Sequence, residues 1–168
     1  KGGTGFRYDG IWTEFLPQIE SKEIDWKEHF KHVLETQGII TTKPLKLYWM
    51  YHNNDEEFVK SKIWRLISSD KDEAVQVVIS PQMESDLYLY RDYDDGIEIN
   101  KISDSLFCTK MSTRNEMIYI IKQRIDPKHM KSFLSAVEPV AGTTGDQSLA
   151  EVVLSGIVPI HESIKDNN

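Results

Sequence analysis

A succession of short strand-forming runs between Leu45 and Ile121 is the feature that most constrains how this chain can fold. Polar or turn-forming residues separate the runs. In the run 97–102, apolar and polar residues alternate strictly, as they do in a strand with one buried face. Asp95-Gly96 just before it is a hairpin signal, because glycine tolerates the positive φ that two-residue turns need. Closely spaced runs of this kind predict strands that pair in antiparallel order.

The predicted strands number six or seven. The segment 58–68 fits either a helix or a strand, and the short polar turn at 69–72 favours a hairpin with the run that follows. The segment 157–160 can add one short strand near the end. The main predicted strands lie at 45–52, 63–67, 74–79, 86–93, 97–102, 106–110 and 117–121.

Helix signals flank the strands. Asp25 with Glu28 forms a capping-box pattern ahead of an amphipathic stripe, which predicts a helix from about 25 to 37. Asp126-Pro127 opens a second predicted helix that Pro139 ends, and Asp146 caps a third. Sequential strands followed by helices predict an α+β fold. We therefore expect an antiparallel β-meander with an N-terminal amphipathic helix and two C-terminal helices.

The chain lacks any composition break that would divide it. Residues 1–168 are predicted to form one domain, with a flexible lead at 1–9 and a frayed tail at 162–168. Because the sequence opens with Lys1-Gly2-Gly3 rather than methionine, we expect it to be excised from a larger protein. The single cysteine, Cys108, excludes an internal disulfide and a cysteine-based zinc site, and a reducing intracellular location, in the cytoplasm, is expected.

The charge balance limits the partners. The formal net charge is −7 and the isoelectric point is near 5.2. A protein that grips a nucleic-acid backbone needs lysine and arginine beside the phosphates, so duplex nucleic acid is excluded as a partner. Anionic membrane surfaces are disfavoured for the same reason. A pocket for one nucleotide remains compatible with this charge.

Aromatic residues are the most informative candidates for a binding surface. The strand 45–52 carries Tyr48 on one face and Trp49 on the other, because successive side chains of a strand point to opposite faces. We expect some of these rings to be partly exposed, where they can contact a protein partner or stack on a base. The candidate binding residues are Tyr48, Trp49, Trp64, Tyr88 and Tyr90.

Metal-binding patterns are weak in this sequence. Asp92, Asp94 and Glu98 surround the Asp95-Gly96 turn, but the glycine falls one place too early for a calcium loop. His29, His32 and Glu35 share a predicted helix, without the order that supplies zinc ligands and a base. A polar hairpin tip and a solvated helix face explain the two groups more simply. No catalytic residue and no cofactor is assigned.

The segment Gly142-Thr143-Thr144-Gly145 is a predicted loop between two helices. It resembles the Gly-x-x-Gly loop of the K-homology RNA-binding module, which clamps a nucleic-acid backbone. Its two middle residues are not basic, and Asp146 follows directly, where a carboxylate would repel phosphate. A plain interhelical turn is the favoured interpretation.

Three functions fit these observations. The first is a non-catalytic recognition domain of a larger protein, which binds a basic protein partner through exposed aromatic residues and an acidic surface. The second is a nucleotide-binding or RNA-end-binding domain in which aromatic rings stack on a base. The third is a metal-dependent hydrolase that uses the carboxylates near Asp95. The sequence carries no nucleophile elbow, phosphate loop or dinucleotide fingerprint, so an enzyme is the less favoured class.

Overall fold

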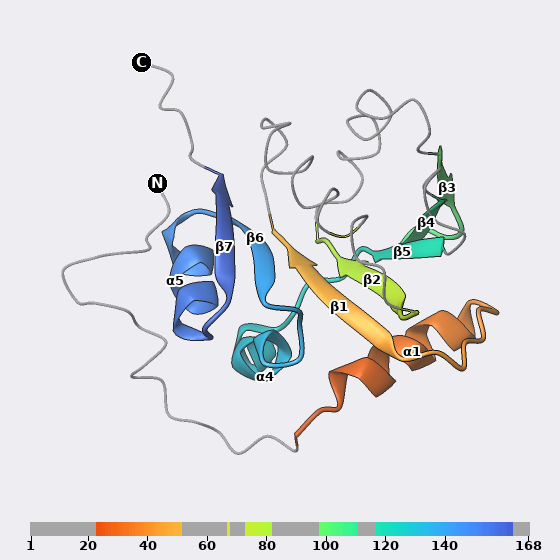
Figure 1. Cartoon of the computed structure of the whole chain (residues 1–168), viewed down its shortest axis with the longest axis horizontal. Coiled ribbons are helices and arrows are strands. Elements are labelled where there is room, and N and C mark those ends of the chain that lie inside the picture. The colour runs from red at the N-terminus through yellow and green to blue at the C-terminus, as the bar shows by residue number, and fades with distance from the viewer. Residues whose placement is uncertain (1–22, 52–66, 68–72, 82–97, 111–116, 163–168) are drawn as a thin grey trace.

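The computed structural model describes residues 23–51, 67, 73–81, 98–110 and 117–162, and these residues form one sheet with helices packed on it (Figure 1). The helices are α1 (Trp26–Thr36), α4 (Met130–Leu134), preceded by a 3-10 turn at Pro127–His129, and α5 (Asp146–Leu154). The strands are β1 (Leu45–Met50), β2 (Val75–Ile79), β3 (Glu98–Lys101), β4 (Leu106–Lys110), β5 (Met117–Ile121), β6 (Val140–Thr144) and β7 (Val158–Glu162).

The sheet is mixed, with strand order β3-β4-β5-β2-β1-β6-β7. The strands β5, β2, β1, β6 and β7 pair in parallel, and the hairpin of β3 and β4 adds an antiparallel edge. The predicted α+β class is confirmed at this level, but the purely antiparallel meander is wrong. Parallel neighbours need a long crossover between them, and the sequence interpretation replaced that crossover before β2 by a hairpin turn.

The predicted strands at 45–52, 74–79, 97–102, 106–110 and 117–121 correspond to β1 to β5. Ile67 is helical and fully buried, so at this residue the helix alternative for 58–68 holds and the favoured strand 63–67 is wrong. The rest of that strand, the strand 86–93 and the Asp95-Gly96 turn lie outside the described residues, as do the lead 1–9 and most of the predicted tail.

The predicted helix from about 25 to 37 is confirmed as α1. The Asp25 side chain accepts a hydrogen bond from the Glu28 amide at 3.1 Å, and Gly38 follows the last turn with φ 82°. The helix buries Trp26, Phe30 and Leu34 against the sheet. The order of the later elements differs from the prediction, because β6 lies between α4 and α5 where a loop was expected.

The central strands β1 and β2 are buried on both faces. On one face, α1, α4 and α5 cover Leu47, Trp49 and Val77. On the other face, Tyr48, Met50 and Val78 pack with Ile67 and Phe107 in a second apolar cluster. A parallel strand covered on both faces is apolar almost throughout, which explains why β1 carries aromatic residues on both sides.

The strand β7 forms one edge of the sheet among the described strands. The Val158 amide donates inward to the Pro139 carbonyl at 3.0 Å. The backbone nitrogen of the next residue, Pro159, therefore points away from β6. At that position the missing N–H of proline removes no hydrogen bond of the sheet. Within the described residues, no helix has the length and apolar character needed to cross a membrane.

Candidate functional site

The strand order reverses at β1. From β1 the chain adds β2 and then β5 on one side, and it later returns to place β6 and β7 on the other side (Figure 1). The strands β1 and β6 are hydrogen-bonded neighbours, with Trp49 opposite Ala141 and Met50 opposite Gly142. In open parallel sheets, ligands bind outside the carboxyl ends of the strands at such a reversal. The candidate site is therefore the edge where β1, β6 and β7 end.

Tyr51 stands at the end of β1. Its amide donates to the Gly142 carbonyl at 2.9 Å, which continues the pairing with β6 by one residue. Its half-buried ring lies parallel to the Trp49 ring, with 6.0 Å between centroids and 4° between planes. Among the described residues, Tyr51 is thus an aromatic side chain at this edge, and it packs on the core through Trp49.

Gly145 connects β6 to α5. Its φ of 71° and ψ of 156° fall in a region that is essentially restricted to glycine. A Cβ added there would meet no atom within 4 Å, so the space around this backbone is open. Among the described residues, no side chain caps the amino end of α5. Ser148 instead donates to the carbonyl oxygens of Thr144 and Gly145, which leaves the first amides of the helix free of side-chain caps.

Thr143 and His161 form a pair at the same edge. They are opposite each other in the β6–β7 ladder, and Thr143 Oγ1 lies 3.0 Å from His161 Nδ1. Thr143 is fully buried, whereas His161 is exposed. The pair places a neutral hydroxyl and an imidazole beside the turn that begins α5.

The charges on α5 are acidic. Asp146 is exposed in the first turn, where a carboxylate interacts favourably with the amino end of a helix. Burial raises the pKa of the Glu151 carboxyl, and the hydrogen bond from Gln147 at 3.2 Å opposes that rise. An anion bound here would be held by amide and side-chain N–H and O–H donors, and Asp146 would oppose its binding.

Of the sequence-predicted aromatic residues, the structure describes Tyr48 and Trp49, which pack on opposite faces of β1. Tyr48 is 5% exposed and Trp49 is 3% exposed, so these two rings are buried and are not among the partly exposed rings that the sequence led us to expect. The cause is the cover of helices and apolar side chains on both faces of β1. Trp64, Tyr88 and Tyr90 lie outside the described residues, and their predicted role stays a prediction.

The structure describes only some of the residues that were predicted as possible metal ligands. Asp92 and Asp94 lie outside the described residues, and Glu98 starts β3. Within the part of the chain that the structure describes, no three histidine, cysteine or acidic side chains gather in a way that could hold a metal ion.

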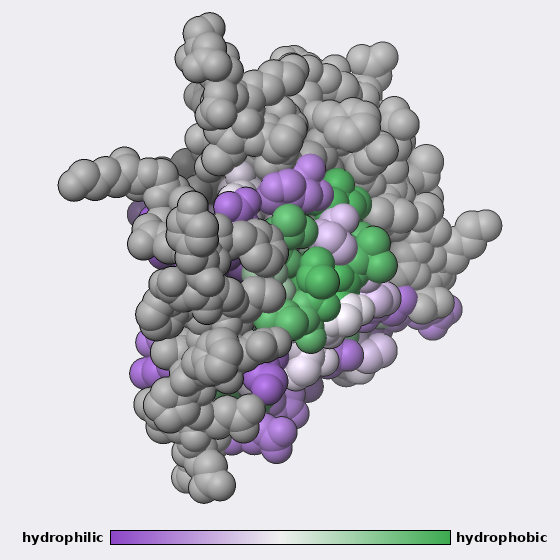
Figure 2. Space-filling model, turned by 90° about the vertical axis from the view of Figure 1, so that its left-hand side faces the viewer, coloured by the Kyte–Doolittle hydropathy of each residue, from purple (hydrophilic) through white to green (hydrophobic). Residues whose placement is uncertain are grey.

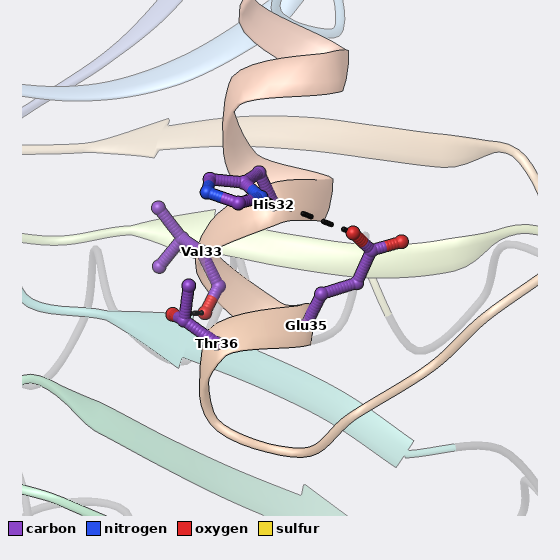
Figure 3. Close-up of polar contacts among 4 residues, drawn as sticks. All are labelled: His32, Val33, Glu35 and Thr36. Atoms are coloured by element: carbon purple, nitrogen blue, oxygen red, sulfur yellow. Dashed lines mark hydrogen bonds and ion pairs between the residues drawn. The ribbon is translucent and has the colours of Figure 1, made fainter.

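The helix pair His32 and Glu35 is a solvated contact, as interpreted from the sequence. Its nitrogen and oxygen lie 3.9 Å apart, with side chains that are 75% and 39% exposed (Figure 3). Beside it, Thr36 Oγ1 donates to the Val33 carbonyl at 2.7 Å. His29 turns away from this pair and contacts the Trp26 ring edge-on.

Cys108 is buried in β4, as the sequence predicted for a structural cysteine. Burial raises the pKa of its thiol, which disfavours the reactive thiolate form.

From the sequence, the segment 142–145 resembled a Gly-x-x-Gly loop but was interpreted as a plain interhelical turn, and His161 was given no role. The signal for a strand here was the short apolar run Val140-Ala141, which leads through glycine and threonine into a helix start. No protein-family model matches the chain, and no curated protein or solved structure matches it either. The site is therefore assigned from geometry alone.

Proposed function

We propose that this domain binds a nucleotide, a small ligand with a planar base and a phosphate group, at the carboxyl edge of β1 and β6. The observation that carries the proposal is the reversal of strand order at β1, with the open glycine turn of β6 directly at that reversal. This function was one of the alternatives that the sequence left open.

The phosphate and the base of a nucleotide would contact different residues at the carboxyl edge of the sheet. Free amides at the start of a helix are favourable donors to phosphate, and α5 begins at Gly145 without a side-chain cap. Tyr51 ends the neighbouring strand, which lies about 4.8 Å away from β6. In the proposed complex the phosphate contacts the Gly145 turn and the base contacts the Tyr51 ring.

A calorimetric titration tests this function. The probes are AMP, ADP, GDP, UDP and inorganic pyrophosphate, each added to the full chain. Saturable binding of at least one nucleotide, tighter than that of pyrophosphate alone, is the expected result, because the base adds contacts. Absence of heat with every probe at millimolar concentration would overturn the proposal.

The variant Asp146→Asn is expected to bind the preferred nucleotide roughly two- to fivefold more tightly, because it removes a negative charge from the first turn of α5. The matched control is Asp104→Asn. Asp104 pairs with Lys101 at 2.7 Å in the β3–β4 turn, far along the sheet from β6. Both substitutions change the net charge by the same amount. If Asp104→Asn and Asp146→Asn raise nucleotide affinity equally, the phosphate does not bind at the start of α5.

The second candidate is recognition of a basic protein partner. The described surface beside β7 exposes Val153, Leu154 and Val158, which are 53%, 47% and 62% exposed. Figure 2 shows apolar side chains gathered on this side of the molecule. With a formal net charge of −7, the fitting partner is an apolar segment with basic flanks. This surface is a second support for that function beside Trp64, Tyr88 and Tyr90, whose role stays a prediction.

Replacing Val158 by aspartate is expected to weaken binding of a synthetic amphipathic helix of leucine and lysine by about tenfold, because a charge would be buried in the contact. Fluorescence anisotropy of the labelled peptide measures the affinity. The control is Ile40→Asp, at a residue that is 83% exposed after α1. Equal affinities for Val158→Asp and wild type would refute this use of the surface.

A further inference from the structure

His161 is an exposed residue with one ring nitrogen directed inward. Its Nδ1 lies 3.0 Å from the Thr143 hydroxyl oxygen, and Thr143 is fully buried. Because Nδ1 is turned onto a buried atom, the opposite edge of the ring, which carries Nε2, is the edge that faces solvent. The ring nitrogen that remains available to a ligand is therefore Nε2.

The chemistry of the buried hydroxyl decides which nitrogen carries the proton. A buried hydroxyl that does not donate its hydrogen loses a hydrogen bond, which is costly away from water. The acceptor that the structure places within reach of Thr143 Oγ1 is His161 Nδ1. When Thr143 donates to Nδ1, the neutral imidazole must carry its own proton on Nε2.

The position of the pair connects it to the proposed site. Thr143 lies on the same face of β6 as Ala141, which packs in the core cluster that includes Val152 of α5. Thr143 is also two residues before Gly145, where the open turn begins. The solvent-facing edge of His161 thus lies at the carboxyl edge of the sheet, on the face that carries α5.

We propose that the Nε2–H of His161 donates a hydrogen bond to a phosphate oxygen of the bound nucleotide, and that Thr143 is the positioning residue that holds this tautomer. The proposal rests on the proposed nucleotide-binding function and names a donor for it. It also explains how an acidic domain can hold an anion at an edge where the adjoining helix carries Asp146 rather than a lysine.

The tautomer can be read without any ligand. Two-bond ¹H–¹⁵N correlation spectra of the full chain identify which nitrogen of each neutral histidine is protonated, and comparison with His161→Gln assigns the signals. We expect the Nε2–H form in the wild type and in Thr143→Ser, which keeps the hydroxyl. In Thr143→Val the hydroxyl is absent, and the signals should shift towards a mixture. A wild-type ring protonated on Nδ1 would overturn the role of Thr143.

The ligand contact is tested with inorganic pyrophosphate, which needs no base. We expect His161→Leu to bind it roughly tenfold more weakly than the wild type, as for loss of a hydrogen bond to a charged acceptor. His161→Gln keeps an N–H donor and should lie between the two, and Thr143→Val should weaken binding while Thr143→Ser does not. Circular dichroism confirms that each variant is folded.

The outcomes separate the two proposals. If the wild type binds pyrophosphate and His161→Leu binds it equally, the proposed site can stand but the His161 contact is refuted. If the wild type binds neither pyrophosphate nor any nucleotide, the proposed function and the contact both fall. The proton position on His161, read by spectroscopy, is decided independently of either binding result.

Discussion

Replacing Phe133 by alanine is expected to destabilise the domain by about 3–5 kcal/mol, because a fully buried aromatic ring would leave a cavity. Small domains have a total stability of only about 5–15 kcal/mol, so this one change can remove most of it. Urea denaturation followed by far-ultraviolet circular dichroism gives the free energy of unfolding directly.

The size of this effect follows from the position of Phe133 between three elements. Its ring contacts the rings of Trp26, Phe30 and Trp49 at centroid distances of 5.4, 6.2 and 5.3 Å, respectively. These contacts join α4 to α1 and to the central strand β1. The control is Leu154→Ala, at a residue that is 47% exposed, where a much smaller loss is expected. A similar small loss for Phe133→Ala would contradict the packing described here.

Replacing Gly145 by alanine is expected to lower nucleotide affinity by tenfold or more and to cost about 1–3 kcal/mol of folding stability. The stability cost arises because only glycine readily adopts φ 71° with ψ 156°. The loss of affinity has a separate cause, since the turn must distort and a Cβ must enter the open space that the phosphate is proposed to fill. Calorimetry with the preferred nucleotide measures the affinity of the folded variant.

Gly156 supplies a matched control for this variant. It follows α5 at the opposite end of the helix, also has a positive φ of 73°, and also has no atom within 4 Å of an added Cβ. We expect Gly156→Ala to destabilise the domain through backbone strain while leaving nucleotide affinity unchanged. If both variants lose affinity in proportion to stability, the effect is one of folding, and the Gly145 turn is not the phosphate contact.

The elements with local signals could be predicted from the sequence. Asp25 and Glu28 define the start of α1, and the alternation in 97–102 matches β3, because both signals act between residues that are close in the chain. Strand direction has a weaker signal. A continuously apolar run such as β1 indicates a strand that is covered on both faces, but it does not identify the partner strand. The pairing of Leu47 with Val77 is a contact between residues far apart in sequence.

The candidate site depends on the same distant pairing and was therefore missed. Thr143 and Gly145 gain their significance from being next to β1, and His161 gains its partner from the pairing of β6 with β7. The glycine and threonine content of 142–145 also favours a loop in any local interpretation, although Gly142 to Thr144 lie in β6. The burial of Tyr48, one of the candidate binding residues, could not be predicted for a related reason, since the cover on its face includes Ile67 from a distant part of the chain.

The proline in β7 has a consequence for how this molecule can meet another chain. A peptide that extended the sheet beyond β7 would need an amide donor from every second residue of the strand, and Pro159, which stands at one of these positions, has none. Addition of a strand at this edge therefore loses one hydrogen bond there. This loss disfavours the edge-to-edge pairing of sheets that leads to fibres.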